Sequence, residues 1–344
     1  MSRLGIVTSD SPSLKTVAGD IATVFSELGV QSRVYTRQIP FYEAKTLFDR
    51  SIVFMPFDPT YVLTYVLLYR DYRNHGITSA FYTTVEGKPV RTMIPKWVRR
   101  DVEAIAVSNY VKERLEYADI NVVDVIPHGV DLQLTSKVSP DNERLKRLTG
   151  GSMVFGAVAS GHRRKGLDLL AKAIEQVNSK IDAGFYVLTE PKAEPLFAKC
   201  GNTYVDTRFG KLSRLEVLNL ISSFNFYVCS SLSEGFGLPL LESQAFGIPV
   251  VYPDYPPLNE FIDSRINFPY QYRDVEEYRD VFGIAFEFHI YRVEDLAGAI
   301  MEAYNVYATD SEKYHVMSEE ARRQIAEKYD IRHVYHAFKR HINL

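Results

Sequence analysis

Cysteine is scarce in this sequence, which has two cysteines and one tryptophan among 344 residues. Cys200 and Cys229 lack the spacing of metal ligands and give no disulfide framework, so we expect a reducing, cytoplasmic environment. The longest apolar run, from Tyr61 to Tyr69, is too short to span a bilayer. Residues 1–7 run straight into a strand pattern and do not resemble a signal peptide.

The sequence also lacks a strong positive charge and several nucleotide-binding motifs. The formal net charge of −3 gives no positive field for nucleic acid, so no nucleic-acid partner is expected. Neither half has Gly-x-Gly-x-x-Gly after its first strand, which argues against a dehydrogenase, and no Gly-x-x-x-x-Gly-Lys-Ser/Thr loop occurs. No Asp-x-Asp pair occurs either, which argues against a metal ion that bridges a diphosphate.

What the sequence does have is a regular alternation of strand-like and helix-like runs. The expected strands are 4–8, 33–36, 51–55, 78–83, 104–108 and 122–126, then 153–158, 185–189, 204–207, 226–230 and 250–252. This alternation predicts an α/β protein with two domains, each a parallel sheet covered by helices. A polar stretch ending at Gly150-Gly151 divides residues 1–150 from 151–320, and a charged helical segment, 321–344, follows.

Two carboxylates, Glu234 and Glu242, stand in the run 233–242 that follows the expected strand 226–230. Glycines in this run permit a ligand to approach the main chain closely, and a proline suits the first position of a helix. One carboxylate would therefore lie on a loop and the other near a helix N-terminus, an arrangement that suits a polyol ligand. Taken alone, Glu242 could equally be an ordinary partner of the helix dipole.

A second motif, 159–166, follows the first strand of the second domain and precedes a helix. It carries three adjacent cations, Arg163, Arg164 and Lys165. At a strand-to-helix turn these side chains and the positive end of the helix are well placed for a diphosphate. The segment alone could be a solvated basic turn, but beside the paired carboxylates it indicates a nucleotide-sugar site.

Four blocks of the sequence resemble one enzyme family. They are 107–112 together with 125–131, then 164–170, then 234–242 followed by 247–251, and finally 259–260. Through these blocks the chain resembles the retaining glycosyltransferases of family 4 (glycosyl transferases group 1), which have the GT-B fold. The resemblance implies two Rossmann-like domains facing each other across a cleft. The first would bind the acceptor and the second the nucleotide-sugar donor, with the C-terminal segment packed back on the first.

The resemblance also implies a chemistry. Such enzymes move a sugar from a nucleoside diphosphate to an acceptor hydroxyl, retain the anomeric configuration, and need no cofactor and no metal ion. The acceptor would be a sugar, a lipid-linked glycan or a protein. The residues implied in donor binding are Arg163, Arg164, Lys165, Glu234, Gly235, Phe236, Gly237, Leu238 and Glu242. Of these, Glu234 would hold the transferred sugar, Glu242 the ribose and Lys165 the diphosphate.

The first domain departs from the family pattern. A Thr-x-His element facing the donor sugar is matched here by Thr84-Val85-Glu86, so Glu86 stands where a histidine is expected. Glu86 is a candidate for orienting the acceptor or the donor sugar, and it could also be a surface carboxylate. His128, in the block that closes the first domain, is the further residue implied in substrate binding.

Two questions stay open at this stage. A nucleotide-sugar epimerase, a glycogen-type synthase or a non-catalytic sugar-nucleotide-binding protein would fit the same motifs. A basic stretch around the single tryptophan, 88–100, could give a peripheral contact with an anionic membrane or could be a solvated helix face.

Overall fold

The computed structural model describes residues 2–344, which divide into two compact units. Unit 1 comprises the chain up to Asp131 together with Glu277–Glu287 and Lys328–Leu344. Unit 2 comprises Leu132–Glu276 and Phe288–Glu327. No helix within residues 2–344 is long and apolar enough to cross a membrane.

The domain boundaries differ from those predicted at residues 150 and 320. Helix α7 (Asn142–Thr149) packs on the strands of unit 2, so the division falls after Asp131. Helix α13 (Ser311–Lys328) also stays with unit 2, because Arg322 donates to the carbonyl of Phe246 at 3.0 Å. The polar composition of the stretch before Gly150 reflects an exposed helix rather than a linker.

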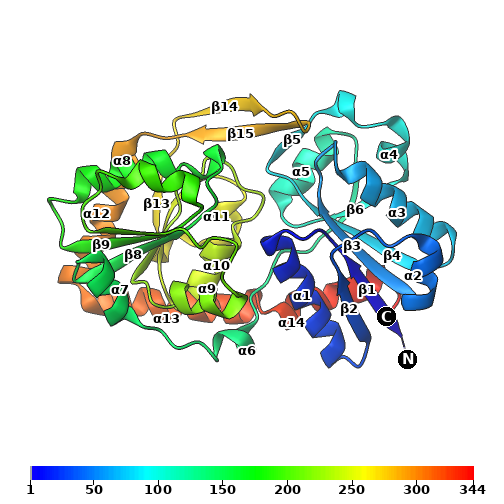
Figure 1. Cartoon of the computed structure of the whole chain (residues 1–344), viewed down its shortest axis with the longest axis horizontal. Helices are drawn as coiled ribbons and strands as arrows, with labels where there is room; N and C mark the ends of the chain where they lie inside the picture. Colours follow the sequence, from blue (N-terminus) through cyan, green and yellow to red (C-terminus); the bar gives the residue numbers. More distant parts are fainter. Residues whose placement is uncertain (1) are drawn as a thin grey trace. The chain divides into compact units, whose positions relative to one another are not determined.

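Unit 1 is built on a six-stranded parallel sheet with the order β2-β1-β3-β4-β6-β7 (Figure 1). Its strands are β1 (Arg3–Val7), β2 (Gln31–Tyr35), β3 (Arg50–Pro56), β4 (Thr78–Thr84), β6 (Glu103–Ala106) and β7 (Asn121–Val125). Its helices are α1 (Pro12–Glu27), α2 (Phe41–Leu47), α3 (Val62–Asn74), η1 (Arg91–Met93), α4 (Lys96–Asp101), α5 (Asn109–Tyr117), α14 (Ile331–Val334) and η5 (Tyr335–His341). All six strands predicted for the first half are present.

The end of the chain returns to unit 1 and packs beside α1. Val130 and Asp330 form an isolated parallel bridge. Arg332 joins the two parts of the unit, since its guanidinium lies 2.7 Å from Glu27 and 2.9 Å from Asp131. The C-terminal residues therefore pack on the first part of unit 1, beside α1.

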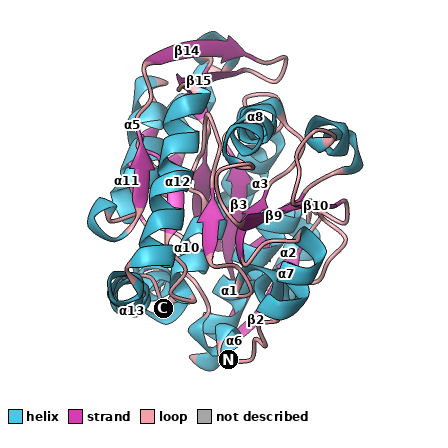
Figure 2. Ribbon diagram, turned by 90° about the vertical axis from the view of Figure 1, so that its left-hand side faces the viewer, coloured by secondary structure: helices cyan, strands magenta, loops and turns pink. Residues whose placement is uncertain are grey.

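Unit 2 repeats the plan with a parallel sheet of order β10-β9-β8-β11-β12-β13. Its strands are β8 (Met153–Val158), β9 (Ala183–Leu188), β10 (Thr203–Asp206), β11 (Phe226–Val228), β12 (Val250–Pro253) and β13 (Phe268–Tyr270). Its other helices are α6 (Leu132–Thr135), η2 (Arg163–Lys165), α8 (Leu167–Val177), η3 (Pro191–Phe197), α9 (Arg214–Ile221), α10 (Leu238–Ala245), α11 (Leu258–Phe261), η4 (Ser264–Ile266) and α12 (Val293–Thr309). Figure 2 shows the strands in magenta among the helices in cyan.

Burial explains why β8 and β9 are continuous apolar runs. Every residue of both strands is buried, as expected where helices cover both faces of a parallel sheet. Helix α8 packs beside α12, whereas α9 packs beside α10. The strand order runs from β8 outward in one direction to β9 and in the other to β11. The carboxyl ends of β8 and β11 therefore flank the switch point, where open α/β sheets bind ligands.

A small antiparallel sheet was not predicted. It contains β14 (Asp274–Arg279), β15 (Ile284–Ile290) and the three-residue β5 (Gly87–Pro89), in the order β14-β15-β5. Phe286 pairs with Gly87, which brings two segments far apart in sequence together in unit 1.

Glu287 fixes the end of this sheet within unit 1. The carboxylate is 7% exposed and lies 3.0 Å from Nζ of Lys88, and it accepts a hydrogen bond from the Tyr110 hydroxyl at 3.1 Å. Arg114 forms a second ion pair with it. Burial alone would raise the pKa of Glu287, but the two cations outweigh it and hold the pKa below its usual value.

We therefore expect Glu287→Gln to destabilise unit 1 by about 1–3 kcal/mol at pH 7, because two partly buried cations lose their counterion. A lowered carboxyl pKa contributes stability above the unfolded value of about 4.3, and this contribution is lost as pH falls through the folded value. Urea unfolding at several pH values should show the difference from wild type shrinking below about pH 4. Glu277→Gln, which removes the exposed partner of Arg279, is the matched control and should change little.

Candidate active site

The candidate site lies where two loops leave neighbouring parallel strands of unit 2. Phe226 of β11 pairs with Phe155 of β8, so the loops that follow these strands start side by side. One loop contains the basic turn and the other the paired carboxylates. The structure thus brings together the two motifs that the sequence placed about seventy residues apart.

The basic turn is fastened directly to the second loop. Gly166 has a φ of +59°, and a Cβ there would stand 2.1 Å from the carbonyl oxygen of Ser230. The Ser230 hydroxyl donates to the carbonyl of Lys165 at 2.8 Å. The amide of Leu232 donates to the carbonyl of Arg164 at 2.6 Å. Glycine is required at this contact because both its backbone angle and the space exclude a side chain.

Buried tyrosines hold the second loop from the other side. The hydroxyls of Tyr270, Tyr291 and Tyr255 donate to the carbonyls of Cys229, Ser230 and Ser231, at 2.8, 2.6 and 2.8 Å. All three rings are nearly inaccessible to solvent. Three successive carbonyls are therefore satisfied by fixed donors, and the loop after them has a defined course.

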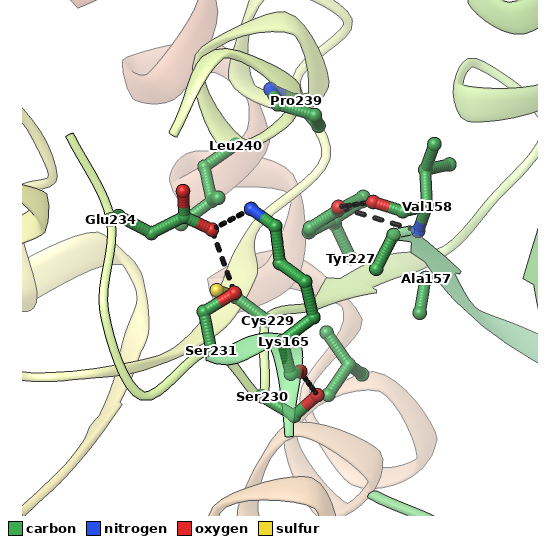
Figure 3. A pocket seen from close by; sticks show the side chains of 12 residues that line it. Ala157, Val158, Lys165, Tyr227, Cys229, Ser230, Ser231, Glu234, Pro239 and Leu240 are labelled. Carbon is green, nitrogen blue, oxygen red and sulfur yellow. Dashed lines mark hydrogen bonds and ion pairs between the residues drawn. The ribbon is translucent and has the colours of Figure 1, made fainter. Parts of the chain in front are cut away.

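Glu234 is the charged centre of the site (Figure 3). The Lys165 ammonium donates to its Oε1 at 2.5 Å, and the Ser231 hydroxyl donates to the same oxygen at 2.7 Å. Arg164 lies 3.4 Å from its Oε2. Glu234 is 7% exposed, and burial would raise its pKa, but the charges of Lys165 and Arg164 lower it overall. The carboxylate therefore stays ionised near neutral pH.

Within residues 2–344, two backbone donors of the loop have no hydrogen-bond acceptor. The amides of Gly235 and Gly237 are on buried residues and donate no hydrogen bond to any group of residues 2–344. Gly237 has a φ of +100° and is the N-cap of α10. Buried backbone donors are rarely left unpaired, so these amides are suited to a ligand's oxygen atoms.

The remaining residues of the motif have different surroundings. The ring of Phe236 is stacked on Phe261 with 4.5 Å between centroids, so its backbone rather than its side chain is available at the loop. Helix α10 begins at Leu238, one residue earlier than predicted, and Pro239 is its second residue. The proline still costs the helix no hydrogen bond, since the second amide has no intrahelical acceptor.

Glu242 lies deeper in unit 2, at 1% exposure on α10. Its Oε1 is 2.6 Å from Nη1 of Arg214, the first residue of α9. Burial raises the pKa of Glu242, and Arg214 offsets this only in part. Sequence reasoning missed Arg214. The sequence signal that could have identified Arg214 is a cation in the first turn of a helix, where the helix dipole disfavours positive charge.

A cavity of about 20 Å³ is lined by residues of both loops, among them Lys165 and Glu234, and by Tyr227 of β11 (Figure 3). This volume admits about one water molecule. A sugar would therefore have to bind on the loops themselves. Among residues 2–344, no three His, Cys, Asp or Glu side chains are grouped so as to hold a metal ion.

The predicted residues of the first domain lie in unit 1. Glu86 is half-buried in the loop between β4 and β5, and the pairing of Gly87 with Phe286 fixes the end of that loop. His128 is 6% exposed, with its Nδ1 2.9 Å from the Tyr82 hydroxyl, and burial lowers its pKa to about 3. His128 is therefore neutral and part of the core, and its contact with substrate stays a prediction, as does that of Glu86.

Cations of the basic stretch are largely paired within unit 1. Arg91 and Arg99 both contact Asp119, and Arg100 contacts Asp101. The exposed stretch therefore carries less free charge than its sequence indicates. Arg163, in unit 2, has its guanidinium 5.8 Å from the ring centroid of Phe288.

Two solved structures share this fold over essentially the whole chain. The Anabaena protein HepE, solved in complex with UDP and glucose, has a TM-score of 0.71 at 13% identity and covers 100% of both chains. Sucrose-phosphate synthase from Thermosynechococcus elongatus has a TM-score of 0.67 at 12% identity, covering 99% of this chain and 98% of that one. The fold is GT-B, with two Rossmann-like units, as predicted.

Sequence comparisons point to glycosyltransferases. Residues 152–281 match the family described as glycosyl transferases group 1, a range that contains both loops of the site. Uncharacterized glycosyltransferase 335 of Sulfolobus islandicus rod-shaped virus 1 is 28% identical over 98% of this chain and 99% of its own length. Putative glycosyltransferase ORF330 of Acidianus filamentous virus 2 is 28% identical over 45% of this chain and 50% of its own length. These matches support a GT-B glycosyltransferase.

Replacing the glycine between the two loops should disrupt the site. We expect Gly166→Ala to lower stability by about 1–3 kcal/mol, because the new Cβ meets the Ser230 carbonyl and the residue has positive φ. Gly298→Ala, in α12 with nothing within 4 Å of the new Cβ, should instead stabilise by about 0.5–1 kcal/mol. Thermal unfolding of both variants measures the contrast, and equal effects would contradict a specific close approach at Gly166.

Proposed function

We propose that this protein transfers a sugar from a nucleoside diphosphate to an acceptor hydroxyl, with retention of anomeric configuration and without a metal ion. The observation that carries the proposal is the contact of Lys165 and Arg164 with Glu234 at the switch point of unit 2. This contact supports the proposal because it joins two cations, which suit a diphosphate, to a carboxylate, which suits sugar hydroxyls. The unpaired amides of Gly235 and Gly237 add neutral donors at the same place.

Each group has a separate task in this proposal. Lys165 and Arg164 neutralise the diphosphate, Glu234 accepts hydrogen bonds from the transferred sugar, and Glu242 accepts them from the ribose. The loop backbone from Gly235 to Leu238 contacts donor oxygens. HepE, the structural neighbour, was also solved with UDP-glucose, which makes UDP-glucose the first donor to test.

The reaction breaks the bond between the anomeric carbon and the diphosphate oxygen and forms a bond from the same carbon to the acceptor oxygen. The acceptor's proton passes to a departing diphosphate oxygen on the same face of the sugar, which gives retention. Negative charge grows on the diphosphate as the bond breaks, and the fixed cations and amides stabilise it without reorganisation. These groups are the reason we propose that no metal ion and no cofactor are required.

Unit 1 would supply the acceptor side. Glu86, in its loop fixed by β5, is proposed to orient the acceptor or the transferred sugar. The acceptor class comprises a sugar, a lipid-linked glycan or a protein, and a lipid-linked glycan would bring the enzyme to a membrane surface. Exposed Lys96, beside the single tryptophan, is the cation of the basic stretch best suited to such a peripheral contact.

Removing the central cation tests the proposal. Lys165→Ala should lower turnover by about 10²–10³-fold and weaken nucleoside diphosphate binding, because the diphosphate loses its nearest positive charge. Hydrolysis or transfer of UDP-glucose and calorimetric binding of UDP provide the two measurements. Lys172→Ala, an exposed lysine on α8, is the control for loss of charge alone. Unchanged turnover in Lys165→Ala would rule out the diphosphate assignment.

Metal independence and retention have their own tests. Treatment with EDTA followed by dialysis should leave transfer within about twofold of the untreated rate, because protein cations perform the task of a metal. Loss of activity that Mg²⁺ restores would contradict this. The anomeric configuration of the first product, followed by proton NMR before mutarotation, should equal that of the donor, and an inverted product would contradict the same-face attack.

A further inference from the structure

Arg214 is a charged residue near the site to which neither the motifs nor the family resemblance gives a role. We propose that Arg214 is a positioning residue: it holds Glu242 ionised and oriented so that its carboxylate accepts the hydroxyls of the donor's ribose. This inference rests on the proposed function, since it concerns the ribose end of the same donor. If the protein prefers ribose to deoxyribose, this preference would then depend on Arg214 and Glu242 together rather than on Glu242 alone.

The first support is the geometry of the carboxylate. Oε1 of Glu242 is buried and 2.6 Å from Nη1 of Arg214, yet no donor among residues 2–344 makes an aligned hydrogen bond to it. The contact is therefore an ion pair that leaves acceptor capacity unused. Buried carboxylate oxygens normally accept hydrogen bonds, so this oxygen is suited to a hydroxyl donor from a ligand.

The second support is the position of Arg214 in its helix. Ser213 and Glu216 form a capping box that fixes the start of α9 at Arg214. Leu218 and Ile221, one and two turns further on, are buried on the same face. Because α9 packs beside α10, this face directs the first residue of α9 towards Glu242.

A cation at this position is unfavourable for the helix itself. The N-terminus of α9 carries a partial positive charge, which repels the guanidinium of Arg214. The side chain of Arg214 is 25% exposed, whereas that of Glu242 is 2% exposed. The arginine therefore reaches from the surface to a carboxylate that is mostly buried. Pairing with Glu242 is the interaction in the structure that compensates for the unfavourable placement.

Among the groups packed around Glu242, Arg214 is the one whose charge favours the ionised carboxylate. Helix α10 packs on α9, β11 and β12. From β11, the buried Tyr227 faces the carboxylate but donates its hydroxyl to the carbonyl of Val158 at 3.0 Å. From β12, Tyr252 interacts with Asp254 and Asp263 instead. Arg214 is thus the cation whose charge opposes the effect of burial on Glu242.

The sign of the pH effect follows from this balance. Burial already raises the pKa of Glu242, and removing Arg214 would raise it further. A protonated carboxyl accepts fewer hydrogen bonds, so donor affinity in an Arg214 variant should fall as pH decreases and recover as pH increases. A merely structural role for Arg214 would weaken binding equally at all pH values.

The test compares UDP with its 2′-deoxy analogue by calorimetry between pH 6 and 9. Arg214→Met should bind UDP about tenfold more weakly than wild type, and this loss should be larger at pH 6 than at pH 9. It should also discriminate less between UDP and 2′-deoxy-UDP, because the ribose acceptor is lost. Arg214→Lys should restore most of the affinity, since it retains the charge, and Arg147→Met, an exposed arginine of α7, should behave as wild type.

The outcomes separate this inference from the proposed function. If wild type binds UDP and Lys165→Ala weakens it, but Arg214→Met shows a loss that is absent or independent of pH, only the role of Arg214 is overturned. If wild type binds neither UDP nor GDP nor ADP, the proposed function itself fails. Should Arg214→Met not fold, Arg214→Gln and the deoxy discrimination of Arg214→Lys decide the question in the same way.

Discussion

The ion pair between Lys165 and Glu234 is the interaction on which the site depends. Each residue follows a different strand, and the two strands are neighbours at the switch point of the sheet in unit 2. A buried carboxylate is costly without a partner, so the two loops are stable in this arrangement because each supplies what the other lacks. The close contact at Gly166 and the serine and amide hydrogen bonds between the loops then fix the distance at which the charges meet.

The surroundings explain how such a charged centre can remain ready for a ligand. Buried tyrosines take up the carbonyls at the start of the loop, so the loop cannot relax to pair its own amides. The amides of Gly235 and Gly237 consequently keep their hydrogen-bonding capacity. Fixed donors and cations of this kind stabilise developing charge more effectively than mobile ones, because they need not reorganise during the reaction.

Much of this could be read from the sequence, since the strands and the loop motifs are encoded locally. The apolar runs gave every strand of the two parallel sheets except β13, and the glycines and charges of 159–166 and 233–242 marked the loops. Tertiary pairings could not be read in the same way. Strand β5 has three residues and is a strand only because β15 pairs with it, and α7 looks like a linker because its exposed face is polar. The pairing of Arg214 with Glu242 joins two helices whose local patterns are unrelated.

The two carboxylates that look equivalent in the sequence are physically different groups. Glu234 has two cations and a hydroxyl, which lower its pKa despite burial, whereas Glu242 has one cation that does not offset burial. Glu234, an ionised carboxylate beside fixed cations, is suited to a sugar that is joined to a charged diphosphate. Glu242, away from those cations and paired with Arg214 alone, is the carboxylate that we propose for the neutral hydroxyls of a ribose. The separation of tasks that we propose within one motif therefore rests on the number of cations near each carboxylate.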